Sequence, residues 1–196
     1  MGITFLLLWL YSVPGVALAE WLAGISNQFP TIEFTKFLFL IAYFLLLTLI
    51  GLHDAKTKYV FSKYAYIAAG LGLGYTLLSL DKTPTIMTIY PYLLAIIIPT
   101  GLFWAMAHFS KERFMGKGDA EIVLAIGCML GWPKVIPAYY FAFIVGAAYG
   151  LSVLARKRGS LKSEVPFGPF LIAGALFGFV YGAQIVNWYA KIYLGF

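Results

Sequence analysis

Residues 34–52 read FTKFLFLIAYFLLLTLIGL, and this stretch decides the class of fold. Its single charged residue is Lys36, close to its beginning. About 20 apolar residues in a helix cross the ~30 Å hydrocarbon core of a bilayer. Backbone polar groups inside lipid must be paired within their own segment, which a helix achieves. The stretch therefore predicts a membrane-spanning helix.

The composition of the whole chain agrees with this prediction. Its 196 residues are 62% hydrophobic and 11% charged, with a mean hydropathy of +0.86. Soluble domains average about 45–50% apolar and roughly 25% charged residues. The single cysteine, Cys128, cannot form an internal disulfide or a thiolate metal site alone. These values exclude an ordinary cytosolic enzyme, a disordered chain and a secreted disulfide scaffold, and indicate an integral membrane protein.

Long apolar runs recur along the chain without the alternation of a membrane barrel. We therefore expect an all-α, polytopic transmembrane helical bundle of about seven spans (six to eight), forming a single membrane-embedded domain over residues 1–196. The predicted spans cover residues 3–22, 34–52, 62–80, 86–109, 120–130, 135–155 and 167–193. The fifth would rise only about 17 Å. Because Gly131-Trp132-Pro133 ends it early, we expect a short, partly inserted helix.

Basic residues indicate the orientation of the bundle. Of the 14 Lys and Arg residues, 10 fall in three connections that seven spans place on one side. They are Lys56, Lys58, Lys63, Lys111, Arg113, Lys117, Arg156, Lys157, Arg158 and Lys162. The positive-inside rule makes this side cytoplasmic, so we expect a multi-pass protein of the cytoplasmic (inner) membrane. The net charge of +6 is then a topology signal that attracts anionic lipid, and it requires no nucleic-acid partner.

Two aspartates stand at the predicted cytoplasmic boundary. Asp54 follows the span at 34–52, and Asp119 precedes the short span at 120–130. An ionised carboxylate is costly near the bilayer core, so these positions are informative. Two structural alternatives remain open. Asp119 would then be a helix N-cap, and Asp54 a solvated charge paired with a nearby lysine, an interaction worth little.

The residues that flank these aspartates favour a functional site. Asp119 completes the tetrapeptide GKGD, in which Gly116 and Gly118 allow the backbone a positive φ and leave room for a peptide strand. The last span begins with PFGPF at residues 166–170. Its two prolines predict a rigid bend, or a helix start with proline in the first turn.

At these residues the chain resembles the type IV prepilin peptidases, polytopic aspartyl proteases with a GxGD motif. Asp54, with a basic residue after it and then Val60, matches the first aspartate of the family. The GxGD glycines and Asp119 match the second, and the runs 130–132 and 166–170 are also typical of it. Many members have lysine where this chain has Glu121. The paired cysteines of larger members are absent, which implies a minimal form without the zinc-binding and methyltransferase region.

The resemblance implies a membrane aspartyl endopeptidase that removes the leader of type IV pilin-like precursors at the cytoplasmic boundary. It implies Asp54 and Asp119 as catalytic residues, and Gly116, Lys117, Gly118, Pro166, Phe167, Gly168 and Pro169 as substrate-binding or motif residues. Two carboxylates that share a proton activate water without a metal or other cofactor. The implied partners are a precursor with a basic leader and an apolar helix, and the lipid bilayer. Helix dipoles favour Asp119 as the anionic base and Asp54 as the proton carrier.

Two functions of other classes remain open on the sequence. One is a small transporter or ion-translocating protein in which the aspartates relay ions or protons, and the other is a non-catalytic membrane assembly factor. Transport sites sit near the bilayer midplane and often accompany inverted repeats. This chain shows no repeat, and both aspartates lie at one predicted boundary. Close approach of the two carboxyl groups discriminates between a peptidase and these alternatives.

Overall fold

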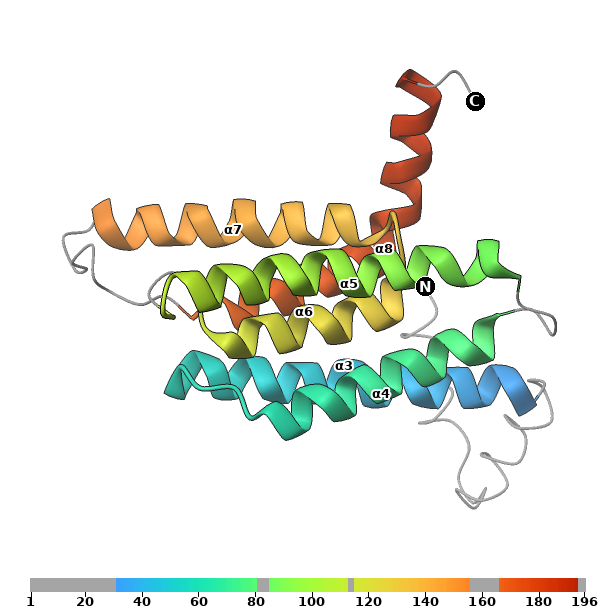
Figure 1. Cartoon of the computed structure of the whole chain (residues 1–196), viewed down its shortest axis with the longest axis horizontal. Helices are drawn as coiled ribbons and strands as arrows, with labels where there is room; N and C mark the ends of the chain where they lie inside the picture. The colour runs from blue at the N-terminus through green and yellow to red at the C-terminus, as the bar shows by residue number, and fades with distance from the viewer. Residues whose placement is uncertain (1–30, 81–84, 113–114, 156–165, 194–196) are drawn as a thin grey trace, which may run out of the picture. The chain divides into compact units, whose positions relative to one another are not determined.

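The structure, a computed structural model, describes residues 31–80, 85–112, 115–155 and 166–193 (Figure 1). Within these ranges every element is an α-helix, which confirms the predicted all-α class. The helices are α3 (Thr31–Thr57), α4 (Ser62–Ser79), α5 (Ile86–Phe109), α6 (Lys117–Leu130), α7 (Val135–Ala155) and α8 (Gly168–Tyr193). The chain divides into two compact units, Met1–Leu38 and Phe39–Phe196. The site described below lies within the second unit.

Four of the described helices are long and apolar enough to cross a bilayer, in the segments Ile32–Thr57, Ile86–Phe109, Val135–Val153 and Gly168–Tyr193. The 18-residue helix α4 is not among them, and α6, with 14 residues, is too short. The predicted span at 3–22 lies outside the described residues. These helices are compatible with the prediction of about seven segments, one of them short.

The predicted boundaries agree with α4, α5, α7 and α8 to within one residue at each end. The first difference is at α3, which continues to Thr57 instead of ending at residue 52. Lys58 then closes the helix with a positive φ of 55°, and its N–H donates to the Asp54 carbonyl at 2.8 Å. Because this left-handed residue ends the helix, Asp54 lies in the last turn of α3 and not beyond it.

The second difference is at α6, which begins at Lys117, three residues before the predicted start. Gly116 is the capping residue, with extended backbone at φ −74° and ψ 153°. The N–H of Asp119 donates to the Gly116 carbonyl at 3.2 Å, as in a first helical turn. The alternative that Asp119 is the N-cap is therefore wrong.

The short helix α6 is the buried element around which its neighbours pack. Ten of its 14 residues are buried. Hydroxyl groups from three other helices donate to its backbone carbonyls. Tyr43 Oη of α3 binds the Ala125 carbonyl at 3.0 Å, Thr76 Oγ1 of α4 binds that of Cys128 at 2.8 Å, and Tyr139 Oη of α7 binds that of Val123 at 3.2 Å. These bonds fix the position of α6 among its neighbours.

Helices α5 and α6 lie side by side, as Figure 1 shows, and pack closely at one point. A Cβ atom on Gly127 would collide with the Ala95 carbonyl oxygen. Within α5, that carbonyl would ordinarily accept a bond from residue 99, but Pro99 has no N–H to donate. The backbone of Gly127 therefore covers a carbonyl that Pro99 leaves without its helical donor.

Candidate active site

Asp54 is buried in the last turn of α3, with 5% of the residue exposed. Its Oδ2 atom accepts a hydrogen bond from the backbone N–H of Gly168 at 3.1 Å. Gly168 is the first residue of α8, and the N–H groups of a first turn have no partner within their own helix. This N–H, at the positive end of the α8 dipole, stabilises negative charge on the carboxyl group of Asp54.

Gly168 also leaves the space that Asp54 occupies. A Cβ atom on Gly168 would lie 2.5 Å from Asp54 Oδ2 and 3.2 Å from Ile122 Cδ1 of α6. The next residue, Pro169, stands in the first turn of α8, where the missing N–H costs no helical bond. The C-terminal end of α3, the beginning of α8 and the first turns of α6 therefore meet at Gly168.

Asp119 is buried in the first turn of α6, at 8% exposure. The pKa of Asp119 is raised to about 7, mainly by burial and also by the negative charge of Asp54, while a hydrogen bond from the backbone N–H of Gly116 lowers it. A carboxyl group whose pKa responds to a second carboxylate lies close to it. The structure thus brings together the two aspartates that the sequence singled out.

The charge distribution of this pair differs from the one that the helix dipoles suggest. The expected assignment makes Asp119 the anion, because it lies at a helix N-terminus. Burial outweighs that dipole, since the pKa of Asp119 is about 7 against an ordinary 3.8. The Gly168 N–H, in contrast, stabilises charge on Asp54. These contacts oppose the assignment from dipoles and favour the proton on Asp119.

The GxGD glycines act through packing and not through unusual backbone angles. Gly116 has φ −74°, and among the described glycines only Gly131 has a positive φ, at 68°. The positive φ that glycine allows is therefore not used at Gly116 or Gly118. A Cβ atom on Gly118 would lie 2.5 Å from Val60 Cβ, so the glycine lets the segment after α3 approach the start of α6. This contact joins the two halves of the sequence motif.

Two other predicted motif residues, Lys117 and Phe167, have partners other than the aspartates. Lys117 forms an exposed ion pair with Glu112 at 2.7 Å. The ring of Phe167 packs against Phe143 of α7, with 5.1 Å between ring centroids. Pro166 precedes the helix. Of the predicted binding residues, Gly168 contacts Asp54, and Gly116 and Gly118 lie in the backbone that leads to Asp119.

Sequence reasoning did not single out the hydroxyl groups that hold α6, those of Tyr43, Thr76 and Tyr139. Their signal was a polar side chain inside an apolar run, where interhelical hydrogen bonds are common. Within the described ranges no cluster of three or more His, Cys, Asp or Glu side chains could hold a metal ion.

Helical segments long enough to span a membrane and a buried aspartate pair at helix ends define a polytopic membrane protein with an acidic site. The type IV leader peptidase family matches residues 40–151, and this chain belongs to that family. The matched range contains both aspartates and Val60, and it ends before Gly168.

Curated relatives carry the name prepilin leader peptidase/N-methyltransferase. The protein from Bacillus subtilis (strain 168) is 32% identical over 94 residues, which cover 48% of this chain and 38% of that protein. The one from Legionella pneumophila is 37% identical over 96 residues, 49% of this chain and 32% of that protein. The matches thus span about a third of the length of these relatives. No solved structure matches the chain.

Proposed function

We propose that this protein is a membrane aspartyl endopeptidase that cleaves the leader peptide of type IV pilin-like precursors at the cytoplasmic boundary of the membrane. Asp54 and Asp119 form its catalytic pair. One observation carries the proposal: two buried carboxyl groups from helices far apart in sequence interact, and one of them has a pKa of about 7. Such a pair shares one proton near neutral pH.

The reaction begins with the pair in its singly protonated form. Asp54, stabilised as an anion by the Gly168 N–H, accepts a proton from water. The water oxygen then forms a bond to the scissile carbonyl carbon. Asp119 donates its proton to the carbonyl oxygen, so the tetrahedral intermediate carries two hydroxyl groups and no net charge. General acid–base catalysis of this kind contributes about 10²–10⁴-fold to a rate.

The second half of the reaction returns both groups to their starting state. Asp54 transfers the proton to the leaving nitrogen, the C–N bond breaks, and a hydroxyl proton of the intermediate returns to Asp119. The proton count of the pair is unchanged after each turnover. Asp54 lies in the last turn of α3 and Asp119 in the first turn of α6, so regular helical backbone holds both carboxyl groups in place.

The substrate class follows from the family and from the position of the pair. The matching family is the type IV leader peptidase family, and the relatives are named prepilin leader peptidase/N-methyltransferase. Asp54 ends a helix long enough to span a bilayer. A precursor with an apolar helix can remain in lipid while the junction with its basic leader reaches the aspartates.

Co-expression with a candidate prepilin-like precursor tests the proposal, with leader loss measured as a mass shift of the precursor. We expect cleavage by the wild type and a loss of about a thousandfold or more in Asp54→Asn and in Asp119→Asn. Glu33→Gln, which neutralises an exposed carboxylate in an ion pair with Lys36, serves as the matched control and should cleave normally.

The same experiment separates the alternatives. Substantial cleavage by Asp119→Asn would contradict the shared-proton pair. A second outcome is that neither the wild type nor any variant removes the leader, while proteoliposomes show a proton flux that depends on both aspartates. The protein is then a transporter, and the peptidase proposal is wrong.

A further inference from the structure

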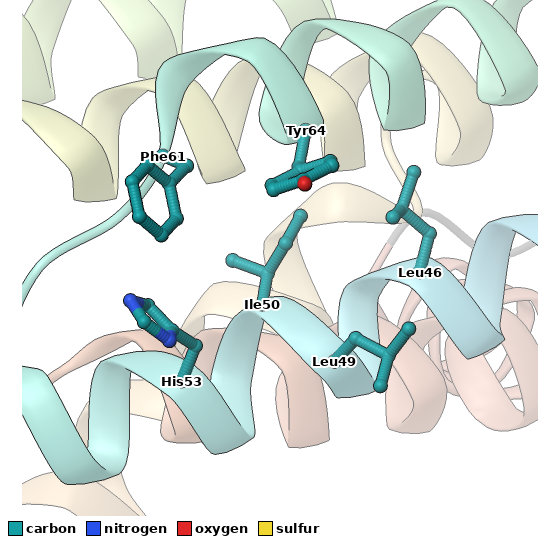
Figure 2. Close-up of a pocket in the computed structure, with 6 residues that line it drawn as sticks. All are labelled: Leu46, Leu49, Ile50, His53, Phe61 and Tyr64. Carbon is teal, nitrogen blue, oxygen red and sulfur yellow. The ribbon is translucent and has the colours of Figure 1, made fainter.

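A groove of about 380 Å³ lies between α3 and α4. It is lined by Leu46, Leu49, Ile50, His53, Phe61 and Tyr64. In Figure 2, Phe61 and Tyr64 face His53 and Ile50 across it. At one end the His53 and Phe61 rings face each other, with 4.8 Å between their centroids. Most of the lining side chains are therefore apolar, and two rings stand at one end of the groove.

The groove follows one face of α3 toward the end of the helix. Leu46, Ile50 and His53 are spaced by four and three residues, which places them on one helical face. From residue 46 to residue 53 this face runs about 10 Å along the helix axis. Lys56 continues the same spacing one turn beyond His53. The apolar groove therefore leads to a cationic side chain at the helix end.

Two further cations stand at this end of the groove. Lys58 lies in the turn after α3, Lys63 lies in the first turn of α4, and both are exposed, as is Lys56. In the described part of the chain no carboxylate lies within ion-pair distance of these lysines, since the two ion pairs present use Lys36 and Lys117. The nearest acid in sequence, Asp54, directs its carboxyl group to Gly168. Among the described residues, no carboxylate compensates the positive charge at this end of the groove.

We infer that this groove binds one anionic phospholipid, with an acyl chain against Leu46, Leu49 and Ile50 and its phosphate at Lys56, Lys58 and Lys63. An apolar cleft that ends in unpaired lysines matches a lipid with an apolar tail and a negative head. Lysines near an anionic lipid surface each strengthen binding. The proposed substrate is a poorer match, because its basic leader would meet three like charges.

This site is independent of the proteolytic proposal. His53 faces the groove, whereas its neighbour Asp54 faces α8. Lipid binding is therefore expected to persist in Asp54→Asn. A failure of the precursor experiment would leave this inference standing, and a failure of lipid binding would leave the peptidase proposal standing.

Native mass spectrometry of the full chain in a neutral detergent tests the inference, with phosphatidylglycerol and phosphatidylcholine as probes. We expect the wild type to retain phosphatidylglycerol in preference to phosphatidylcholine. Lys56→Gln should weaken retention about fivefold. Lys191→Gln, which removes an exposed lysine near the end of α8, should leave it unchanged and controls for general charge.

A second pair of variants tests the apolar part of the site. Leu49→Trp fills the groove, and we expect phosphatidylglycerol retention to fall about tenfold. Leu45→Trp is the matched control, because Leu45 is 58% exposed and Leu49 is 54% exposed on the same helix, but Leu45 does not line the groove. Both positions are exposed, so both variants should unfold at the wild-type temperature.

Three results would overturn the inference. The first is equal retention of the two lipids by the wild type. The second is an equal effect of the groove variants and their controls. The third is capture of a prepilin-like precursor, in place of phosphatidylglycerol, by a photo-crosslinker at residue 49, which would make the groove a substrate site.

Discussion

Asp54 and Asp119 are almost equally buried, at 5% and 8% exposure, but their helices hold them at opposite ends. Asp54 ends α3, where the helix dipole disfavours negative charge, and Asp119 begins α6, where the dipole favours it. Their neighbours reverse this order. A backbone N–H from α8 supports charge on Asp54, and burial together with the charge of Asp54 raises the pKa of Asp119 to about 7. Tertiary contacts, and not the position in the helix, set the chemistry of each carboxyl group.

After replacement of the aspartates themselves, the largest expected effect comes from breaking the support of Asp54. In Gly168→Ala, the new Cβ atom would lie 2.5 Å from Asp54 Oδ2 and must displace the carboxyl group. We expect cleavage to fall about 100-fold, because a displacement of about 1 Å can cost that much. Gly150→Ala in α7 is the control, since a Cβ atom there meets nothing within 4 Å. Equal kcat/KM values for the two variants would show that Gly168 does not position Asp54.

The next effect is on the side of Asp119. In Gly118→Ala, the Cβ atom would lie 2.5 Å from Val60 Cβ and push the start of α6 from the segment after α3. We expect cleavage to fall about tenfold. Gly116→Ala should have little effect, because its Cβ atom would be 3.9 Å from Asp119 Oδ2 and the backbone angles suit any residue. A larger loss in Gly116→Ala than in Gly118→Ala would contradict this assignment.

The pH dependence of stability sharpens the difference between the two acids. The folded protein holds the Asp119 proton up to a pH of about 7, whereas the unfolded chain releases it near the ordinary pKa of 3.8. Between these values the folded state binds more protons, so the free energy of unfolding falls as pH rises from about 4 to about 7. Thermal unfolding in detergent should show this fall in the wild type.

Two variants assign that slope to its causes. Asp119→Asn should remove this contribution to the slope, because no proton is left to release. Asp54→Asn should move the fall to lower pH, because the charge of Asp54 helps to raise the pKa of Asp119. An unchanged curve in Asp119→Asn would show that another group titrates.

The smallest effect concerns the hydroxyl groups that hold α6. In Thr76→Val the Cys128 carbonyl loses its hydroxyl donor, and the N–H of Trp132, its ordinary helical partner, binds Pro91 instead. We expect a loss of about 1–3 kcal/mol in the free energy of unfolding. In Tyr43→Phe the Ala125 carbonyl loses the hydroxyl of Tyr43, but it lies inside α6 and not at the end of the helix. We therefore expect a loss of only about 1 kcal/mol in the free energy of unfolding. Thermal unfolding in detergent measures both, and the reverse order would contradict this interpretation.

The sequence predicted the helices well because length and apolar content are local properties. Four described helices, α4, α5, α7 and α8, begin and end within one residue of their predicted limits. The errors at α3 and α6 arose where backbone contacts, and not composition, decide the boundary. Lys58 ends α3 in a left-handed conformation that a lysine in the sequence does not predict. Gly116 caps α6 without a side chain.

For the candidate site, the sequence identified Asp54, Asp119 and the motifs around them, because carboxylates are rare and conspicuous in apolar segments. It did not assign the work of each motif residue. Gly118 allows the close approach of Val60, the N–H of Gly168 binds Asp54, and Phe167 packs on α7. Such roles depend on partners that lie many residues away in the chain, so local patterns do not contain them.

By itself, then, the sequence determined an all-helical membrane protein, the spacing of its apolar segments and the two acids that interrupt them. Only the tertiary structure decided that the first N–H of α8 meets Asp54 and that burial beside a second carboxylate raises the pKa of Asp119. The physical reason is that hydropathy acts on each segment separately. The energy of a buried charge, in contrast, depends on every dipole and carboxylate that the fold brings within a few ångströms.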